Sequence, residues 1–305
     1  MTTTRSTDIA IVVFCAAMWG LWWYPVQQFE NVGLAGPWIG LAMCACTLPV
    51  GLAWISMRSG GISPRGVLGA LLIGACFMLY AVSVSYTDFI RAVLFFYFAP
   101  AWSTLIELIF FGRRRSAQCL ISIACSFIGI LLISRGEVSF DGLGAIGDWM
   151  ALAAGMSWSI GASLVFSSRE AEVSRVMVIA SLGGVGSALI IAVADGSVAA
   201  GVPDFPDLMI TVPWVFALAA VYVGTMMAGT MWGAYRLPPA VMSYLLSIEI
   251  LGGVLSAALI LGERYGWFEF GGTVFIIGAV LIEVVFAPSG VEKPVSAPAK
   301  TVPPG

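Results

Sequence analysis

The sequence contains no histidine, and only 10% of its 305 residues are charged. Histidine is the commonest metal ligand and the commonest proton relay near neutral pH, so its absence argues against a metal centre. There is also no GxxxxGK[ST] phosphate loop, so the chain cannot power transport by hydrolysing ATP on its own. Since HExxH and GxSxG motifs and paired carboxylates are lacking too, we expect no enzyme, no metal and no cofactor.

Disulfides and nucleic-acid binding also find little support. The six cysteines all fall within apolar segments or at their edges, without a CxxC pair, so we interpret them as small core hydrophobes. The only basic run, Arg113 to Arg115, ends an apolar segment. We therefore expect no nucleic-acid partner.

Long apolar runs are what the sequence has in abundance. Hydrophobic residues make up 60% of the chain, and runs of about twenty apolar residues, enough to cross the bilayer as a helix, recur along its length. A barrel strand would need only about ten residues and would alternate in polarity. The sequence therefore predicts an all-α integral membrane protein with ten transmembrane helices, surrounded by membrane lipids. The predicted spans are residues 9–28, 35–57, 66–86, 89–111, 117–134, 144–166, 174–194, 211–233, 239–261 and 267–286.

The positions of Lys and Arg predict the orientation. With a cytoplasmic N-terminus, three of the 14 basic residues, Arg91, Arg135 and Arg264, fall in outer loops and the other eleven fall in inner loops and tails. This bias agrees with the positive-inside rule and places both termini in the cytoplasm. We expect residues 1–8 to form a short N-terminus without a cleavable signal and the Pro-rich segment 287–305 to be a disordered tail.

The two halves of the chain resemble each other. The segment "AAMWG" at 16–20 is similar to "AAGMSW" at 153–158, and residues 91–114 are similar to residues 239–264. A repeat with an odd number of spans must enter the membrane from opposite faces in its two copies. We therefore predict two inverted five-helix repeats, at 9–134 and 135–286, an arrangement that places the substrate near the midplane in many transporters.

A family resemblance rests on several short motifs. They are Trp19 with Gly20, "FAPAWSTL" containing Pro100, Trp158, Trp232, "LGER" at 261–264, and Gly129 and Gly278 in the closing helices. Over residues 9–286 the chain resembles the drug/metabolite transporter superfamily, in the ten-helix branch with two EamA-type repeats. It is similar to bacterial aromatic amino acid exporters, which implies a bacterial inner membrane and a central cavity lined by aromatic and small polar side chains. One departure is "FGRR" at the end of the first repeat, where the family usually has Gly-Glu-Arg.

Glu249 is the most informative single residue. It lies near the centre of the ninth predicted span, where insertion scales penalise an acidic side chain by roughly 3 kcal/mol. Such a carboxyl should face a cavity or a partner. It could bind a substrate ammonium group or take up a coupling proton, because burial disfavours the charged form. The alternative is a structural carboxyl that is hydrogen-bonded to a neighbouring helix.

Pro100 and Arg91 both belong to the fourth predicted span. Pro100 should kink the helix and free a backbone carbonyl near Phe96, although a proline tolerated for packing is an equal alternative. Arg91 could hold a substrate carboxylate in two parallel hydrogen bonds, or it could pair with Asp88. A compact zwitterion would fit Arg91 with its carboxylate and Glu249 with its ammonium group.

Aromatic residues supply the other candidates for substrate binding. Trp19 and Trp158 take corresponding places in the two repeats at mid-depth, where an indole N–H needs a partner that lipid cannot supply. Trp232 is a candidate because of the resemblance, although it lies near the cytoplasmic edge, where an interfacial anchor is the alternative. The remaining candidates share the middle zone of the membrane and could complete an amphipathic pocket. They are Tyr80, Tyr97, Trp102, Ser243, Tyr244 and Ser247.

These observations favour a secondary transporter of small organic metabolites, amino acids above all, working by alternating access and possible as a monomer. The alternatives are a carrier of the same fold for nucleobases, sugars, organic acids or drugs, and an intramembrane enzyme acting on lipid-linked substrates. A channel or sensory receptor is disfavoured by the repeat.

Overall fold

The computed structural model describes residues 2–22, 24, 28, 36–57, 60–83, 86–87, 89–111, 117–135, 144–168, 170–194, 196, 208–261 and 266–286. Within these residues the protein is helical, apart from turns, short connections and one isolated antiparallel bridge between Ile62 and Ala171, so the expected all-α class is confirmed. The helices are α1 (Thr2–Trp19), α3 (Pro37–Ser56), α4 (Pro64–Ser83), α5 (Phe89–Phe96), α6 (Ala99–Phe110), α7 (Ala117–Ile133), α8 (Ile146–Ser167), α9 (Val173–Ala194), α10 (Leu208–Arg236), α11 (Pro239–Leu246), α12 (Ile248–Ser256) and α13 (Trp267–Phe286), with a π-helical segment at Ala257–Leu261.

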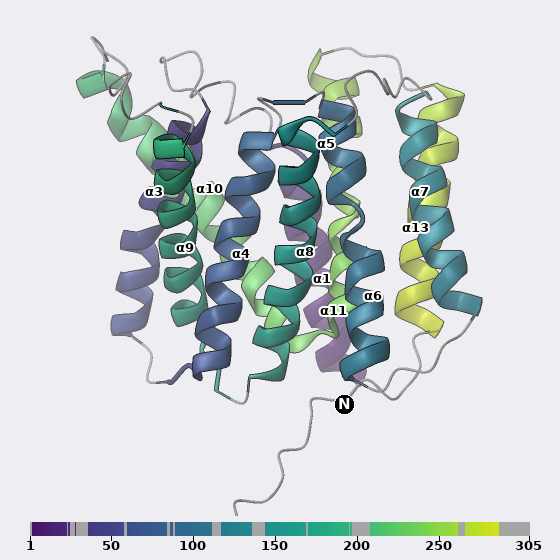
Figure 1. Ribbon diagram of the computed structural model, residues 1–305, viewed down its shortest axis with the longest axis horizontal. Helices are drawn as coiled ribbons and strands as arrows, with labels where there is room; N and C mark the ends of the chain where they lie inside the picture. The colour runs from purple at the N-terminus through teal and green to yellow at the C-terminus, as the bar shows by residue number, and fades with distance from the viewer. Residues whose placement is uncertain are drawn as a thin grey trace, which may run out of the picture.

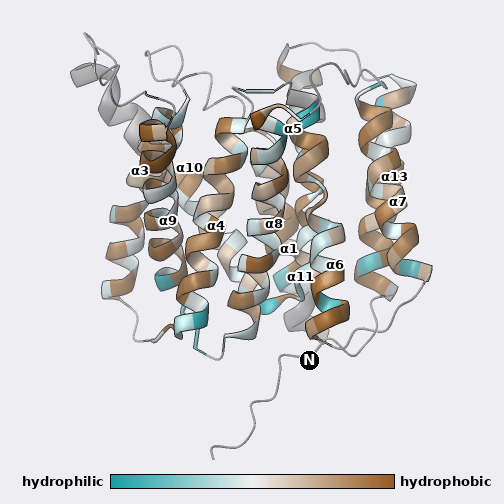
Figure 2. Cartoon of the chain, in the orientation of Figure 1, coloured by the Kyte–Doolittle hydropathy of each residue, from teal (hydrophilic) through white to brown (hydrophobic). Residues whose placement is uncertain are grey.

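Seven helical segments are long and apolar enough to cross a membrane, and each coincides within a few residues with a predicted span. They are Pro37–Ser56, Pro64–Ser83, Arg91–Phe110, Ile146–Ser167, Val173–Ala194, Pro239–Ile260 and Trp267–Val285. Hydrophobic residues dominate these helices, while the strongly hydrophilic ones gather near their ends (Figure 2). The structure thus confirms a multi-pass membrane protein. Two further apolar helices, Ser6–Trp19 and Ala117–Ile133, are shorter, and the number of ten spans and the inverted relation of the halves remain predictions.

The helices stand side by side, and α1 begins at the lower end in Figure 1. Helix α4 packs between α8 and α9, α1 packs against α10 and α12, and α7 pairs with α13 at one edge of the bundle. Glycines allow some of these contacts to be very close: a Cβ on Gly74 of α4 would lie 1.9 Å from the Ala180 carbonyl oxygen of α9. Small residues of this kind let transmembrane helices approach backbone to backbone.

Two membrane spans are interrupted along their length. The fourth predicted span divides into α5 and α6 at Tyr97 and Phe98, and Pro100 follows as the second residue of α6. Proline has no N–H to donate to the carbonyl one turn earlier, and a Cβ on Gly155 of α8 would lie 2.6 Å from the Phe96 carbonyl oxygen. The ninth predicted span divides into α11 and α12 at Ser247. Both interruptions lie in the middle of the bundle, away from the ends of the spans.

Candidate functional site

The two mid-depth tryptophans come together through a phenylalanine. Trp19 of α1 stacks on Phe77 of α4 with ring centroids 5.3 Å apart, and Phe77 meets Trp158 of α8 edge-on at 6.4 Å. Offset-stacked and edge-to-face arrangements are the favourable ones for aromatic pairs. One continuous aromatic surface therefore joins residues from both predicted halves, and the sequence analysis missed the residue that links them.

Both indole N–H groups have hydrogen-bond partners on other helices. Trp19 Nε1 donates to the Thr230 hydroxyl at 3.0 Å, and Trp158 Nε1 donates to the Ser243 hydroxyl at 3.1 Å. Ser243 also lies 2.7 Å from the Ser103 hydroxyl of α6. These bonds fix the two indoles in place, as a polar group without access to water requires.

A second aromatic group surrounds the interruption of the fourth span. Tyr80 of α4 stacks on Phe96 with centroids 4.3 Å apart, and Phe96 meets Tyr97 edge-on at 5.3 Å. Tyr80 follows Phe77 by three positions, so the two side chains lie on the same face of α4. The two aromatic groups are therefore neighbours along one helix.

Glu249 lies in the first turn of α12, directly after the interruption of the ninth span, and its side chain is half-buried. The side chain of Tyr97 lies beside its carboxyl group. Cys76 and Tyr80 of α4 and Tyr222 of α10 are close enough to interact electrostatically with it. Among the residues that the structure describes, no basic side chain forms an ion pair with Glu249.

The backbone around Glu249 touches α1. A Cβ on Gly20 would lie 2.3 Å from the Glu249 carbonyl oxygen, so only glycine fits where these two backbone segments meet. This contact brings the carboxyl-bearing turn next to Trp19. We use the name central cluster for the six side chains of Trp19, Phe77, Tyr80, Tyr97, Trp158 and Glu249.

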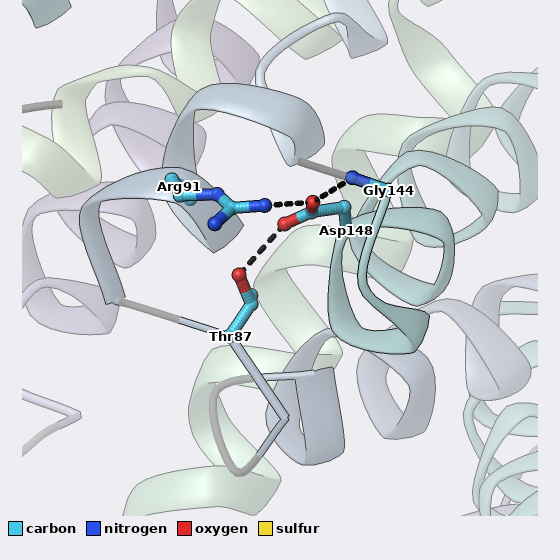
Figure 3. A network of polar contacts seen from close by, with 4 residues as sticks. All are labelled: Thr87, Arg91, Gly144 and Asp148. Atoms are coloured by element: carbon cyan, nitrogen blue, oxygen red, sulfur yellow. Dashed lines mark hydrogen bonds and ion pairs between the residues drawn. The ribbon is translucent and has the colours of Figure 1, made fainter. Parts of the chain in front are cut away.

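Arg91 is not part of the central cluster. Its guanidinium forms a buried ion pair with Asp148 in the first turn of α8, and the two residues are only 4% and 3% exposed (Figure 3). The same carboxylate accepts hydrogen bonds from the Thr87 hydroxyl at 2.7 Å and the Gly144 amide at 2.8 Å. Asp88, the partner considered from the sequence, lies outside the described residues. The observed partner is an acidic residue more than fifty positions away.

Trp232 lies in a polar group near the lower end of the bundle. Its Nε1 donates to Asp8 of α1 at 2.9 Å, and the Arg236 guanidinium carbon lies 4.0 Å from the centre of its ring. Arg236 also approaches Asp8 at 3.6 Å. This arrangement fastens α10 to α1 near the predicted cytoplasmic edge, where the sequence offered an anchor as the alternative to substrate binding.

The remaining candidates divide between two places. Tyr244 and Ser247 are buried beside the interruption of the ninth span, and the Ser247 hydroxyl donates to the Ser243 carbonyl at 3.4 Å. Trp102 instead lines a groove of about 290 Å³ between α6 and α7, together with Phe98. The structure therefore groups most of the predicted residues near the centre, but it places Arg91, Trp102 and Trp232 elsewhere.

Comparison with known proteins finds the same fold in solved structures but gives no activity. No family model and no curated protein matches the chain. Among solved structures 27 chains match. One of them, described only as "Crystal structure of protein", has a TM-score of 0.68 at 16% identity and covers 92% of this chain and 99% of its own. At this identity the likeness shows a shared fold over nearly the full length of both chains and nothing of function.

Proposed function

We propose that the chain is a secondary transporter of small organic metabolites and that the central cluster is its substrate site. The observation that carries this proposal is Glu249, a carboxyl without an ion-pair partner among the described residues, set among aromatic side chains in the middle of a multi-pass membrane protein. Ionisable residues at such depth are costly and mark substrate or ion pathways. Aromatic walls with a few polar groups are typical of small-molecule sites.

The two interrupted helices support alternating access. Transporters with inverted repeats commonly bind their substrate where helices are discontinuous near the midplane. Here α5–α6 and α11–α12 belong to different predicted halves, and each interruption adjoins the central cluster through Tyr97 or Glu249. Relative movement of the halves 9–134 and 135–286 would then expose the cluster to one side of the membrane at a time. Amino acids are the first substrates to try, because the sequence resembles aromatic amino acid exporters.

Glu249 is also our candidate for proton coupling. The titratable groups facing it are Cys76 and Tyr80 on α4, Tyr97 at the interruption of the fourth span, and Tyr222 on α10. None of these is a carboxyl or a base that titrates below neutrality, so Glu249 is the group that would carry the proton. In proteoliposomes the transport that remains in Glu249→Gln should have a flattened pH dependence, and an unchanged pH profile would refute the coupling.

Counterflow in proteoliposomes tests the transporter itself. Purified protein is loaded with unlabelled amino acids, amines, nucleobases, sugars or organic acids, and the uptake of the labelled compound is followed. We expect saturable uptake for one class that collapses in Trp158→Ala, while Trp267→Ala, which changes an 87% exposed tryptophan on α13, retains it. If neither variant changed the uptake, the substrate site would lie outside the central cluster. The absence of uptake for every compound would contradict the transporter proposal.

A further inference from the structure

The charge of the central cluster is unbalanced. Glu249 is its only charged residue, whereas the basic residues that the structure describes with their side chains all lie near helix ends. These are Arg65, Arg91, Arg135, Arg175 and Arg236. An unneutralised carboxylate in a site of low dielectric favours a ligand that brings the missing positive charge.

Arg91 cannot serve as the counter-charge without breaking a buried ion pair. Its guanidinium is held by Asp148, whose carboxylate is stabilised further by Thr87 and Gly144 (Figure 3). Separating such a pair would leave Asp148 buried and uncompensated, which is strongly unfavourable. Arg91 also lies in the first turn of α5, six positions before Tyr97, which corresponds to about 9 Å along a helix axis.

We propose that the central cluster selects a small organic monocation: an amine with an aromatic or apolar body and without a carboxylate. This inference rests on the proposed function and narrows its substrate class. The ammonium group would pair with Glu249, and the body of the ligand would lie against the aromatic surface formed by Trp19, Phe77 and Trp158. Tyrosine and tryptophan rings add a favourable cation–π attraction for the same charge.

A substrate carboxylate has no matching group in the cluster. An amino acid that places its ammonium on Glu249 brings its own carboxylate close to the same negative charge. The site then discriminates by repulsion as well as by attraction, which is the general route to high specificity. The zwitterion expected from the sequence, held between Arg91 and Glu249, is therefore disfavoured by the observed pairing of Arg91.

The test compares ligands that differ only in their charged groups. Binding to the purified chain in lipid nanodiscs is measured by calorimetry for 2-phenylethylamine, phenylalanine and 3-phenylpropionate, and for the corresponding indole compounds. We expect the amine of at least one ring to bind at least about tenfold more tightly than its amino acid, and the acid to bind weakest. Equal or tighter binding of the amino acid, or no binding of either amine, would overturn the inference.

Matched variants assign the preference to Glu249. Glu249→Gln should remove the ratio between amine and amino acid, whereas Glu249→Asp should retain a preference for the amine. Glu269→Gln serves as the control, because Glu269 lies in the first turn of α13 and pairs with Arg135. This variant should leave the ratio unchanged. A ratio that persists in Glu249→Gln would refute the inference. If the amino acid binds better, the chain can still carry solutes in the counterflow assay, so this failure and a failure of the transporter proposal give different results.

Discussion

The upper end of the bundle, where α5 and α8 begin in Figure 1, and the centre of the bundle each hold a carboxylate, but the two carboxylates have different partners. At the upper end, Asp148 receives a guanidinium, a hydroxyl and a backbone amide (Figure 3). In the centre, Glu249 has aromatic neighbours and, among the described residues, no ion-pair partner. Because Asp148 joins α5 to α8 through Arg91, its charge serves the fold.

The comparison teaches that burial of a charge does not reveal its role until its partners are known. A buried ion pair is costly to break, since removal of one partner leaves the other buried and uncompensated. A charge without a partner is costly to keep, so its presence indicates a ligand or a proton that neutralises it at some stage of function. Removal of the Arg91 charge beside Asp148 should therefore lower the free energy of unfolding, whereas removal of the Glu249 charge should leave it the same or raise it.

The largest expected effect is on stability at the upper end. Arg91→Ala should lower the free energy of unfolding by about 3 to 5 kcal/mol, because Asp148 stays buried without its partner. Replacing both residues by leucine should recover most of this loss, since an apolar pair requires no desolvated charge. Denaturant titration in mixed micelles measures the change.

Arg135→Ala provides the matched control for that variant. Arg135 pairs with Glu269 at 2.7 Å but is 50% exposed, and exposed pairs contribute about 0.5 kcal/mol. A loss in Arg91→Ala no larger than the loss in this control would show that the Arg91–Asp148 pair does not fasten α5 to α8.

The second largest effect is expected at the centre of the bundle, where loss of a charge should impair transport without lowering the free energy of unfolding. Glu249→Gln should reduce transport of an ammonium substrate roughly a hundredfold, which corresponds to about 2.7 kcal/mol. Its free energy of unfolding should stay the same or rise, because the variant removes an unneutralised charge. Transport and unfolding are measured on the same preparation. A variant that unfolds as readily as Arg91→Ala would make Glu249 a structural carboxyl.

Much of the fold was accessible from the sequence because lipid imposes a simple rule. A long apolar run in lipid is expected to form a spanning helix, and seven described helical segments coincide with predicted spans. The depth of a residue could be counted along its helix, which identified Glu249, Trp19 and Trp158 as central. The rotation and neighbours of each helix could not be counted in this way.

The partners of individual side chains depend on contacts between distant segments. Asp148 lies at the start of the sixth predicted span, where a carboxyl is unremarkable because headgroup water is near, so nothing in the sequence singled it out for Arg91. Phe77 was one of 18 phenylalanines, and only the crossing of α1, α4 and α8 gives it two tryptophan neighbours. Trp102 was predicted to lie in the middle zone, and it lies on the face of α6 that lines the groove toward α7.

The third prediction concerns the contact that positions Glu249. Gly20→Ala would place a methyl group 2.3 Å from the Glu249 carbonyl oxygen, so α1 and α12 must separate. We expect a loss of about 1 to 3 kcal/mol in unfolding free energy, typical of overpacking, together with weaker substrate binding. Gly186→Ala on α9 is the control, because nothing lies within 4 Å of its added Cβ. If the two variants had equal unfolding free energies and equal substrate binding, the packing of α1 would not be what positions Glu249.

The smallest effect is expected for a neutral hydrogen bond beside the cluster. Trp158→Phe keeps an aromatic ring against Phe77 but removes the N–H that donates to Ser243 at 3.1 Å. Because Ser243 retains the Ser103 hydroxyl as a partner, the loss should be about 1 kcal/mol in unfolding free energy. Substrate affinity should change less than in Glu249→Gln, since a charge is the stronger determinant of binding in an apolar site. If Trp158→Phe instead abolished binding and Glu249→Gln did not, the indole would be the group that recognises the substrate, and the contrast between the two carboxylates would lose its functional meaning.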